Sequence, residues 1–119
     1  METRTLTITI DADWQNTLRS AARSAFAANS YQGERSNFET PEAFFSRLTS
    51  RRWVLLNALQ GAGEVPVREL ARRLQRDVKR VHEDAAELVK LGLIERTERG
   101  GLVCPYLDIH IDMHMRRAV

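Results

Sequence analysis

The sequence predicts an α+β fold on three observations. Apolar and polar residues alternate strictly at both ends of the chain, as in β-strands with one buried face. The stretches between these ends carry apolar residues at helical spacing. Past the middle, two short amphipathic segments joined by a tight turn precede two β-type segments around a Gly-Gly turn. This order predicts a winged helix-turn-helix with an added N-terminal strand and helix and a C-terminal strand.

The N-terminal segment predicts a strand and then a helix. Residues 3–10 place threonines on one face, and the other face carries Leu6, Ile8 and Ile10. Such alternation of β-branched residues is typical of a strand that is half-buried against apolar neighbours. Residues 12–29 continue at helical spacing, with an apolar stripe made of Trp14, Leu18, Ala21, Ala22, Ala25 and Phe26. The polar residues 30–40 predict an exposed linker.

Two further helices are predicted before the helix–turn–helix. Thr40 followed by Pro41 is typical of a helix start, because threonine caps and proline fits the first turn. The apolar face of this helix would consist of Phe44, Phe45 and Leu48. Thr49 or Ser50 would cap the next helix, which Gly61-Ala62-Gly63 ends. Its apolar stripe would consist of Trp53, Leu56 and Leu59 or Gln60.

The helix–turn–helix is predicted between Val67 and Gly92. The first helix would cover residues 67–74, with an apolar stripe made of Val67, Leu70, Ala71 and Leu74. Gln75 and Arg76 would form the turn, and Asp77 would cap a second helix over residues 78–91. Gly92 tolerates the left-handed conformation that ends a helix. Residues 93–97 and 102–104 then predict a hairpin around the turn at residues 98–101.

The C-terminal residues 107–115 alternate again, and this second terminal strand predicts a dimer. Since an unpaired strand exposes backbone hydrogen-bonding groups, the two terminal strands should pair within a subunit or between two subunits. We expect a homodimer whose interface contains Leu6, Ile8, Ile10, Trp14, Leu18, Ala22, Ala25, Ile109, Ile111 and Met113. The alternative is a monomer in which the N-terminal helix folds onto its own sheet.

The second helix of the helix–turn–helix carries the predicted base contacts. On a helical wheel, one side should pack on the other helices and consists of Val78, Val81, Ala85 and Leu88. Side chains in the first turns of such a helix reach base edges in the major groove. We therefore expect contacts from Lys79, Arg80 and His82. Glu83 would accept from a cytosine amino group or pair with Lys79 one turn away.

The remaining predicted DNA contacts are arginines. Phosphate contacts are expected from Arg51, Arg52, Arg68 and Arg76. Arg96 and Arg99 flank the hairpin turn, where an arginine can enter the minor groove. Residues 51–80 contain eight basic and three acidic side chains, a net charge of +5 (8 − 3), although the whole chain carries only +2. A local positive face is typical of a surface that contacts phosphates.

Length and composition favour one small globular protein. The 119 residues are 43% hydrophobic, and they suit one domain with an added dimerisation layer. The predicted parts are residues 1–37 for dimerisation or partner binding, 38–106 for DNA binding and 107–119 as a C-terminal strand and tail. A single cysteine, Cys104, excludes an intrachain disulfide. Since there is no signal peptide and no apolar run of spanning length, we expect a cytoplasmic protein without membrane contact.

The sequence also resembles known regulators. The spacing of Glu69-Leu70-Ala71, Val81, Leu88 and Gly92-Leu93-Ile94-Glu95-Arg96 is similar to that of MarR-like and ArsR-like winged-helix repressors. A closer resemblance, over residues 38–112, is to a family of small transcriptional regulators of archaea and bacteria. It lies in Leu48-Thr49, Arg52-Trp53, residues 67–72, 76–79 and 81–82, Pro105-Tyr106, Ile109 and Asp112. Pro66 departs from that family, in which a serine usually caps the helix.

Two functions follow as hypotheses. The first is a dimeric regulator, most simply a repressor, that binds double-stranded DNA in a sequence-specific manner. The second is an antitoxin-like interaction module, since the resemblance implies that some relatives accompany a toxin-like protein. We predict no enzyme, cofactor or metal, because no nucleophile or acid–base motif is present. The polar face made of Asp108, His110, Asp112 and His114 is explained by strand alternation. Cys104 is expected to be a small buried residue of the hairpin.

Overall fold

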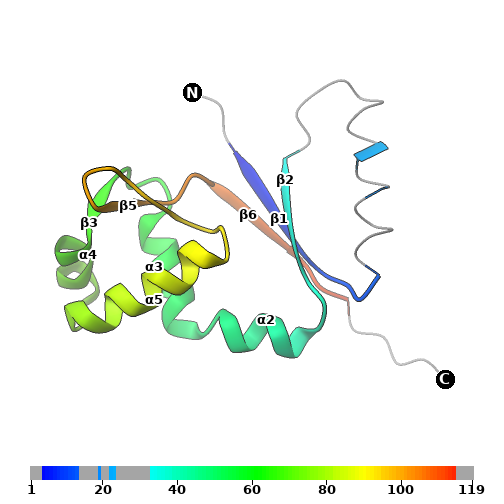
Figure 1. The fold of residues 1–119 in the computed structure, drawn as a ribbon, viewed down its shortest axis with the longest axis horizontal. Helices are drawn as coiled ribbons and strands as arrows, with labels where there is room; N and C mark the ends of the chain where they lie inside the picture. The colour runs from blue at the N-terminus through cyan, green and yellow to red at the C-terminus, as the bar shows by residue number, and fades with distance from the viewer. Residues whose placement is uncertain (1–3, 14–18, 20–21, 24–32, 115–119) are drawn as a thin grey trace. The chain divides into compact units, whose positions relative to one another are not determined.

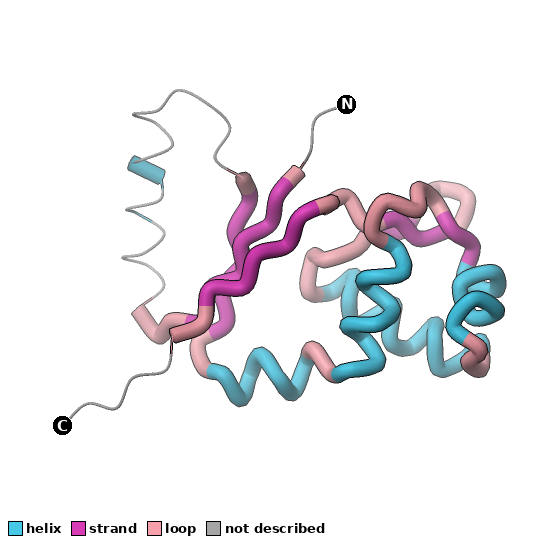
Figure 2. Tube along the Cα trace, turned by 180° about the vertical axis from the view of Figure 1, so that it is seen from behind, coloured by secondary structure: helices cyan, strands magenta, loops and turns pink. Residues whose placement is uncertain are grey.

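The computed structural model describes residues 4–13, 19, 22–23 and 33–114, and within them the fold is α+β. The chain divides into two compact units, residues 1–46 with 108–119 and residues 47–107. Figure 1 labels most elements of both units, and Figure 2 shows the same chain from behind. The predicted helix over residues 12–29 falls almost wholly outside the described residues, and so do the predicted interface residues Trp14, Leu18 and Ala25. Ala22 is described and exposed.

The first unit contains a three-stranded sheet in the order β2-β1-β6. Its strands are β1 (Thr5–Ile10), β2 (Glu34–Phe38) and β6 (Asp108–Asp112), and both outer strands run parallel to β1. The terminal strands therefore pair within one subunit, which is one of the two arrangements expected from the sequence. In the central strand Leu6 and Ile8 are buried. Ile10 and Ile109 are partly exposed, whereas Ile111 and Met113 lie at the surface.

Strand β2 corrects the sequence prediction of a linker over residues 30–40. Two of its polar side chains, Glu34 and Asn37, have partners on neighbouring residues. The guanidinium of Arg4 forms an ion pair with the carboxylate of Glu34. The Thr9 hydroxyl donates to Asn37 Oδ1 at 2.7 Å, and Asn37 Nδ2 donates to the carbonyl of Asp11 at 3.0 Å. The linker prediction was wrong because an edge strand with polar partners lacks the apolar alternation that identifies strands.

Helix α2 (Pro41–Arg47) begins as predicted, since the Thr40 hydroxyl accepts from the amide of Ala43 at 3.1 Å. Phe44 is buried and packs edge-on against Phe38, with 5.3 Å between the ring centroids. Phe45 was expected on the buried face, but 58% of its surface is exposed. Adjacent residues of an α-helix point to different sides, so Phe44 and Phe45 cannot share one buried stripe.

The second unit contains three helices and a small sheet in the order β3-β5-β4. The helices are α3 (Ser50–Leu59), α4 (Val67–Leu74) and α5 (Val78–Lys90). The strands are β3 (Val65–Pro66), β4 (Glu95–Arg96) and β5 (Gly101–Val103), and β5 pairs antiparallel with both neighbours. Strand β3 was not predicted, because two residues are too few for a periodicity to be recognised.

The core of this unit is largely the predicted one. Helices α3, α4 and α5 bury Leu55, Leu56, Leu59, Leu70, Ala71, Val81, Ala85 and Leu88, and the strands and loops add Val65, Leu93, Ile94 and Leu102. Trp53, which was predicted on the apolar stripe of α3, is only half-buried. Leu55, which was not predicted there, is fully buried. Val78 was predicted to be buried, but 43% of its surface is exposed. As the first residue of α5 it has no preceding turn to cover it.

The turn between α4 and α5 is tight and well defined. Gln75 adopts a left-handed conformation with φ of 54°, and the Arg76 amide donates to the carbonyl of Ala71 at 3.0 Å. The Asp77 side chain then caps α5 by accepting from the amide of Arg80 at 3.3 Å, as predicted. At the start of α4, Pro66 occupies the cap position and provides no side-chain hydrogen bond. Gly92, with φ of 77°, follows the end of α5.

Candidate nucleic-acid interface

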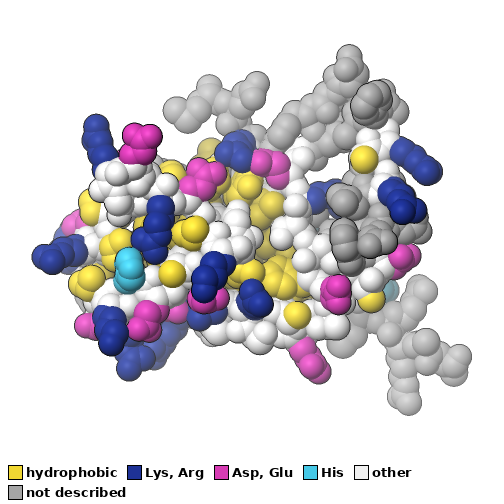
Figure 3. Space-filling model, in the orientation of Figure 1, with side chains coloured by type: hydrophobic (Ala, Val, Ile, Leu, Met, Phe, Trp, Pro, Cys, Tyr) yellow, Lys and Arg dark blue, Asp and Glu magenta, His cyan; other side chains and the backbone are white. Residues whose placement is uncertain are grey.

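The site proposed from the sequence lies entirely within the second unit. Helix α5 follows the α4–α5 turn, and the β4–β5 hairpin follows α5. In Figure 1 the hairpin turn and the start of α5 lie toward the same end of this unit. Figure 3 shows Lys and Arg side chains gathered at that end, with a histidine among them and acidic side chains interspersed.

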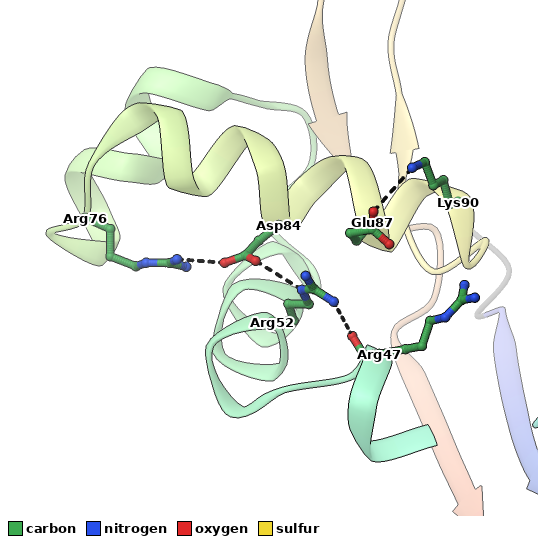
Figure 4. A network of polar contacts seen from close by, with 6 residues as sticks. All are labelled: Arg47, Arg52, Arg76, Asp84, Glu87 and Lys90. Carbon is green, nitrogen blue, oxygen red and sulfur yellow. Dashed lines mark hydrogen bonds and ion pairs between the residues drawn. The ribbon is translucent and has the colours of Figure 1, made fainter. Parts of the chain in front are cut away.

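The cations of this unit fall into two classes, and those of the first class are paired with a carboxylate. Asp84, on the buried side of α5, receives a hydrogen bond from Arg52 Nε at 3.0 Å and another from Arg76 Nη2 at 2.7 Å. Only 16–21% of these three side chains is exposed. Figure 4 shows Arg52 and Arg76 converging on the carboxylate from either side. Arg52 also donates to the carbonyl of Arg47 at 2.7 Å.

This cluster, which we call the Asp84 clamp (Arg52, Arg76 and Asp84), joins three segments of the unit. It ties α5 to α3 and to the turn that precedes α5. Burial alone would raise the pKa of Asp84, but the hydrogen bonds from Arg76 and Arg52 outweigh it and lower the pKa below its usual value. Both guanidinium groups are therefore paired with Asp84 and largely buried, unlike the exposed cations described below.

A second group of paired cations lies on α4. Glu69 forms ion pairs with Arg72, one turn ahead, and with Arg73, at 3.1 Å. The hydrogen bonds from Arg72 and then Arg73 lower the pKa of Glu69 to about 2. These two arginines lie at the surface, where such pairs contribute little to stability. They form a natural comparison for the cations without an acidic partner.

The second class consists of exposed cations that have no ion pair among the described residues. Its members are Arg47, Arg51, Arg68, Lys79, Arg80, Arg96 and Arg99. Of the eight cations predicted to contact DNA, six are in this class and the other two belong to the Asp84 clamp. His82 and Glu83 are exposed on α5 beside Lys79 and Arg80. Val81, between them in the sequence, is fully buried and fixes which face of the helix turns outward.

The base of the hairpin is held by polar contacts. The Thr97 hydroxyl donates to Glu64 Oε1 at 2.8 Å and accepts from the amide of Gly101 at 2.9 Å. Gly100 lies in the turn with φ of 82°, a conformation that side chains other than glycine rarely adopt. Arg96 and Arg99 extend from this ordered hairpin into solvent. Cys104 is buried beyond it, as predicted, and burial raises the pKa of its thiol.

Asp84 is the residue that the sequence prediction missed. It stands three residues after Val81 and four before Leu88, so it falls on the buried side of the helical wheel. Arg52 likewise lies three residues before Leu55 and four before Leu56, so it falls on the buried side of α3. Charged residues on buried faces are paired as a rule, and this signal would have found Arg52 and Asp84, two of the three members of the clamp.

A protein-family model matches residues 47–111, which is more than half of the chain. The chain belongs to the HVO_A0114 family. The matched stretch begins where the second unit begins and ends inside β6. The name of this family states no activity, and the resemblance to MarR-like and ArsR-like repressors stays a prediction. No curated protein and no solved structure matches the chain.

Two negative findings apply to the described residues, which are 4–13, 19, 22–23 and 33–114. No group of three or more His, Cys, Asp and Glu side chains in these ranges converges on a position that would hold a metal ion. None of the helices described is long and apolar enough to cross a membrane.

Proposed function

We propose that the second unit is a winged helix-turn-helix that binds double-stranded DNA, and that the protein is a dimeric transcriptional regulator of the repressor type. Helix α5 would enter the major groove and the β4–β5 hairpin would serve as the wing. The observation that carries the proposal is the division of the cations. Those beside the outward face of α5 and on the hairpin are exposed and have no acidic partner among the described residues, whereas those behind α5 are paired with Asp84.

The chemistry of the outward face of α5 fits base edges. Lys79 and Arg80 can donate to the O6 and N7 acceptors of guanine, and the neutral or charged imidazole of His82 can donate as well. Arg51 and Arg68 lie on neighbouring helices and would neutralise phosphates. Arg96 and Arg99 would reach the minor groove from the wing. A dimer would place two such helices on half-sites about one helical turn, roughly 34 Å, apart and would exclude polymerase from that stretch of DNA.

Selection of duplexes from a random pool tests this proposal, because it assumes no operator. We expect the intact protein to enrich a two-fold symmetric site. Arg80→Ala should relax the preference at one position in each half-site, with a loss of about 1–3 kcal/mol in discrimination. Arg68→Ala should instead weaken binding to all duplexes alike and reduce the slope of log K against log salt by about one unit.

The second hypothesis, an interaction module of the antitoxin type, predicts a different result. In that case no duplex would be enriched, and neither variant would differ from the unchanged protein in any binding measurement. Enrichment of a duplex site without two-fold symmetry would support DNA binding by single copies of the protein and would count against the dimer.

A further inference from the structure

Strand β6 is an edge strand whose outer side is unpaired. It forms hydrogen bonds with β1 on one side, and no strand in the described ranges pairs with its other side. Ile111 in this strand is 39% exposed, and Met113, which follows the strand, is 37% exposed. An exposed edge with apolar side chains invites pairing with another strand, and proteins generally cover such edges.

The titratable side chains of β6 have no ion pair among the described residues. Asp108, His110 and Asp112 alternate on one face, and His114 follows in the same alternation. Across the sheet these strand residues face threonines of β1, at positions 5, 7 and 9. None of the four forms an ion pair within the part of the chain that the structure describes. Both the backbone edge and the charges are therefore available to a second molecule.

The sequence of β6 is complementary to itself in one antiparallel register. When two copies pair about a two-fold axis at Ile111, each His110 faces Asp112 of the other copy. In the same register Ile111 faces Ile111 of the other copy, and Ile109 faces Met113 of the other copy. Asp108 then faces His114. Directly opposed residues of an antiparallel pair project to the same face and interact. Apolar residues thus meet apolar residues on one face, and acids meet histidines on the other.

Neighbouring registers fit less well. With an axis at His110, Asp108 of each copy would face Asp112 of the other copy. This register would place like charges opposite each other in two pairs. An axis between two residues would oppose apolar with polar side chains along the whole strand. An axis at Ile109 also gives acid–histidine pairs, but it requires residues 106 and 107 as strand partners. Those residues belong to the second unit, and Tyr106 is already buried there.

We propose that a second copy of this chain pairs with β6, antiparallel and centred on Ile111, so that the two three-stranded sheets join into one sheet of six strands. This inference rests on the proposed function only in that it specifies the interface of the proposed dimer. An isologous contact of this kind closes on itself, so it covers the exposed edge without leading to fibres.

Single cysteines test the register. In a Cys104→Ala background, Ile111→Cys should form an intermolecular disulfide under mild oxidation, since directly opposed Cα atoms lie about 4.5–5.5 Å apart. The matched variants Ile109→Cys, His110→Cys and Asp112→Cys should not cross-link alone, because copies offset by two or more residues lie about 7 Å or more apart. A mixture of the His110→Cys and Asp112→Cys chains should cross-link. Cross-linking of Ile109→Cys alone would overturn the register.

A charge swap provides a second test that needs no cross-link. His110→Asp should raise the dimer dissociation constant by about 10- to 30-fold, because two acid–histidine pairs become acid–acid pairs. Adding Asp112→His to that variant should restore the dissociation constant to within about 3-fold, since the pairs are then exchanged across the axis. With an axis at Ile109 the dissociation constant of the double variant would stay high, and that result would contradict the proposal.

Oligomeric state and DNA binding separate this inference from the proposed function. A protein that is monomeric in light scattering at about 100 µM would overturn the β6 interface. A dimer that binds a symmetric duplex but does not cross-link through Cys at position 111 would overturn the interface and leave the proposed function standing. A dimer that cross-links there and ignores every duplex would support the interface and overturn the proposed function.

Discussion

Replacing Asp84 with alanine is expected to lower the free energy of unfolding by about 2–4 kcal/mol. The change leaves the guanidinium groups of Arg52 and Arg76 without their carboxylate, and at least four-fifths of the Arg76 side chain is buried. Arg76 Nη1 is already buried without an acceptor among the described residues, so no other partner is at hand. Chemical denaturation followed by circular dichroism measures the effect.

The loss should depend on pH. Because the pKa of Asp84 is lowered in the folded chain, its contribution is present above the ordinary carboxyl pKa of about 4 and is lost as the pH falls through the lower folded value. The difference between the unchanged protein and Asp84→Ala should therefore be full at pH 7 and should shrink toward pH 2.

Glu69→Ala is the matched control for this prediction. It also removes a carboxylate that holds two arginines, but at a site open to solvent, so the change in stability should be much smaller. Equal losses from the two variants would show that the Asp84 clamp has no special role in positioning α5.

The double variant Lys79→Ala/Arg80→Ala is expected to raise the Kd for a selected duplex by about 100-fold or more near 0.1 M salt, since two donors to base edges are removed. The double variant Arg72→Ala/Arg73→Ala loses the same formal charge from cations that are paired with Glu69. It should raise Kd by less than about 5-fold. Fluorescence anisotropy with a labelled duplex provides both values.

This pair of variants separates a specific surface from a general charge effect. If the two double variants weakened binding equally, the affinity would depend on net charge alone, and α5 would not be the recognition helix. If neither weakened it, the duplex would bind elsewhere on the protein.

The helices of the second unit could be predicted almost residue by residue because their signals are local. The apolar spacing in residues 67–74, the Asp77 cap and the stop at Gly92 each act within one or two turns. The same holds for the burial of Val81, Ala85 and Leu88. These are properties that a periodic pattern and a capping side chain determine directly.

The features that escaped prediction depend on contacts between distant residues. The pairing of Arg52 with Asp84 spans 32 positions, and the chain shows only that each lies on a buried face. Strand β2 gains its partners from β1 through Thr9 and Asn37, about 28 positions apart. Charge alone does not reveal which arginines already have a carboxylate partner, so the pairing of Arg52 and Arg76 with Asp84 was not predicted.

Amide hydrogen exchange of the intact protein, with and without a selected duplex, tests the central claim most directly. The account predicts that the duplex slows exchange in the first turns of α5, around residues 78–83, and in the hairpin turn at residues 97–100. Residues 84–90, which follow on the same helix, should change less. A duplex that binds tightly while protecting neither of these segments would contradict the account.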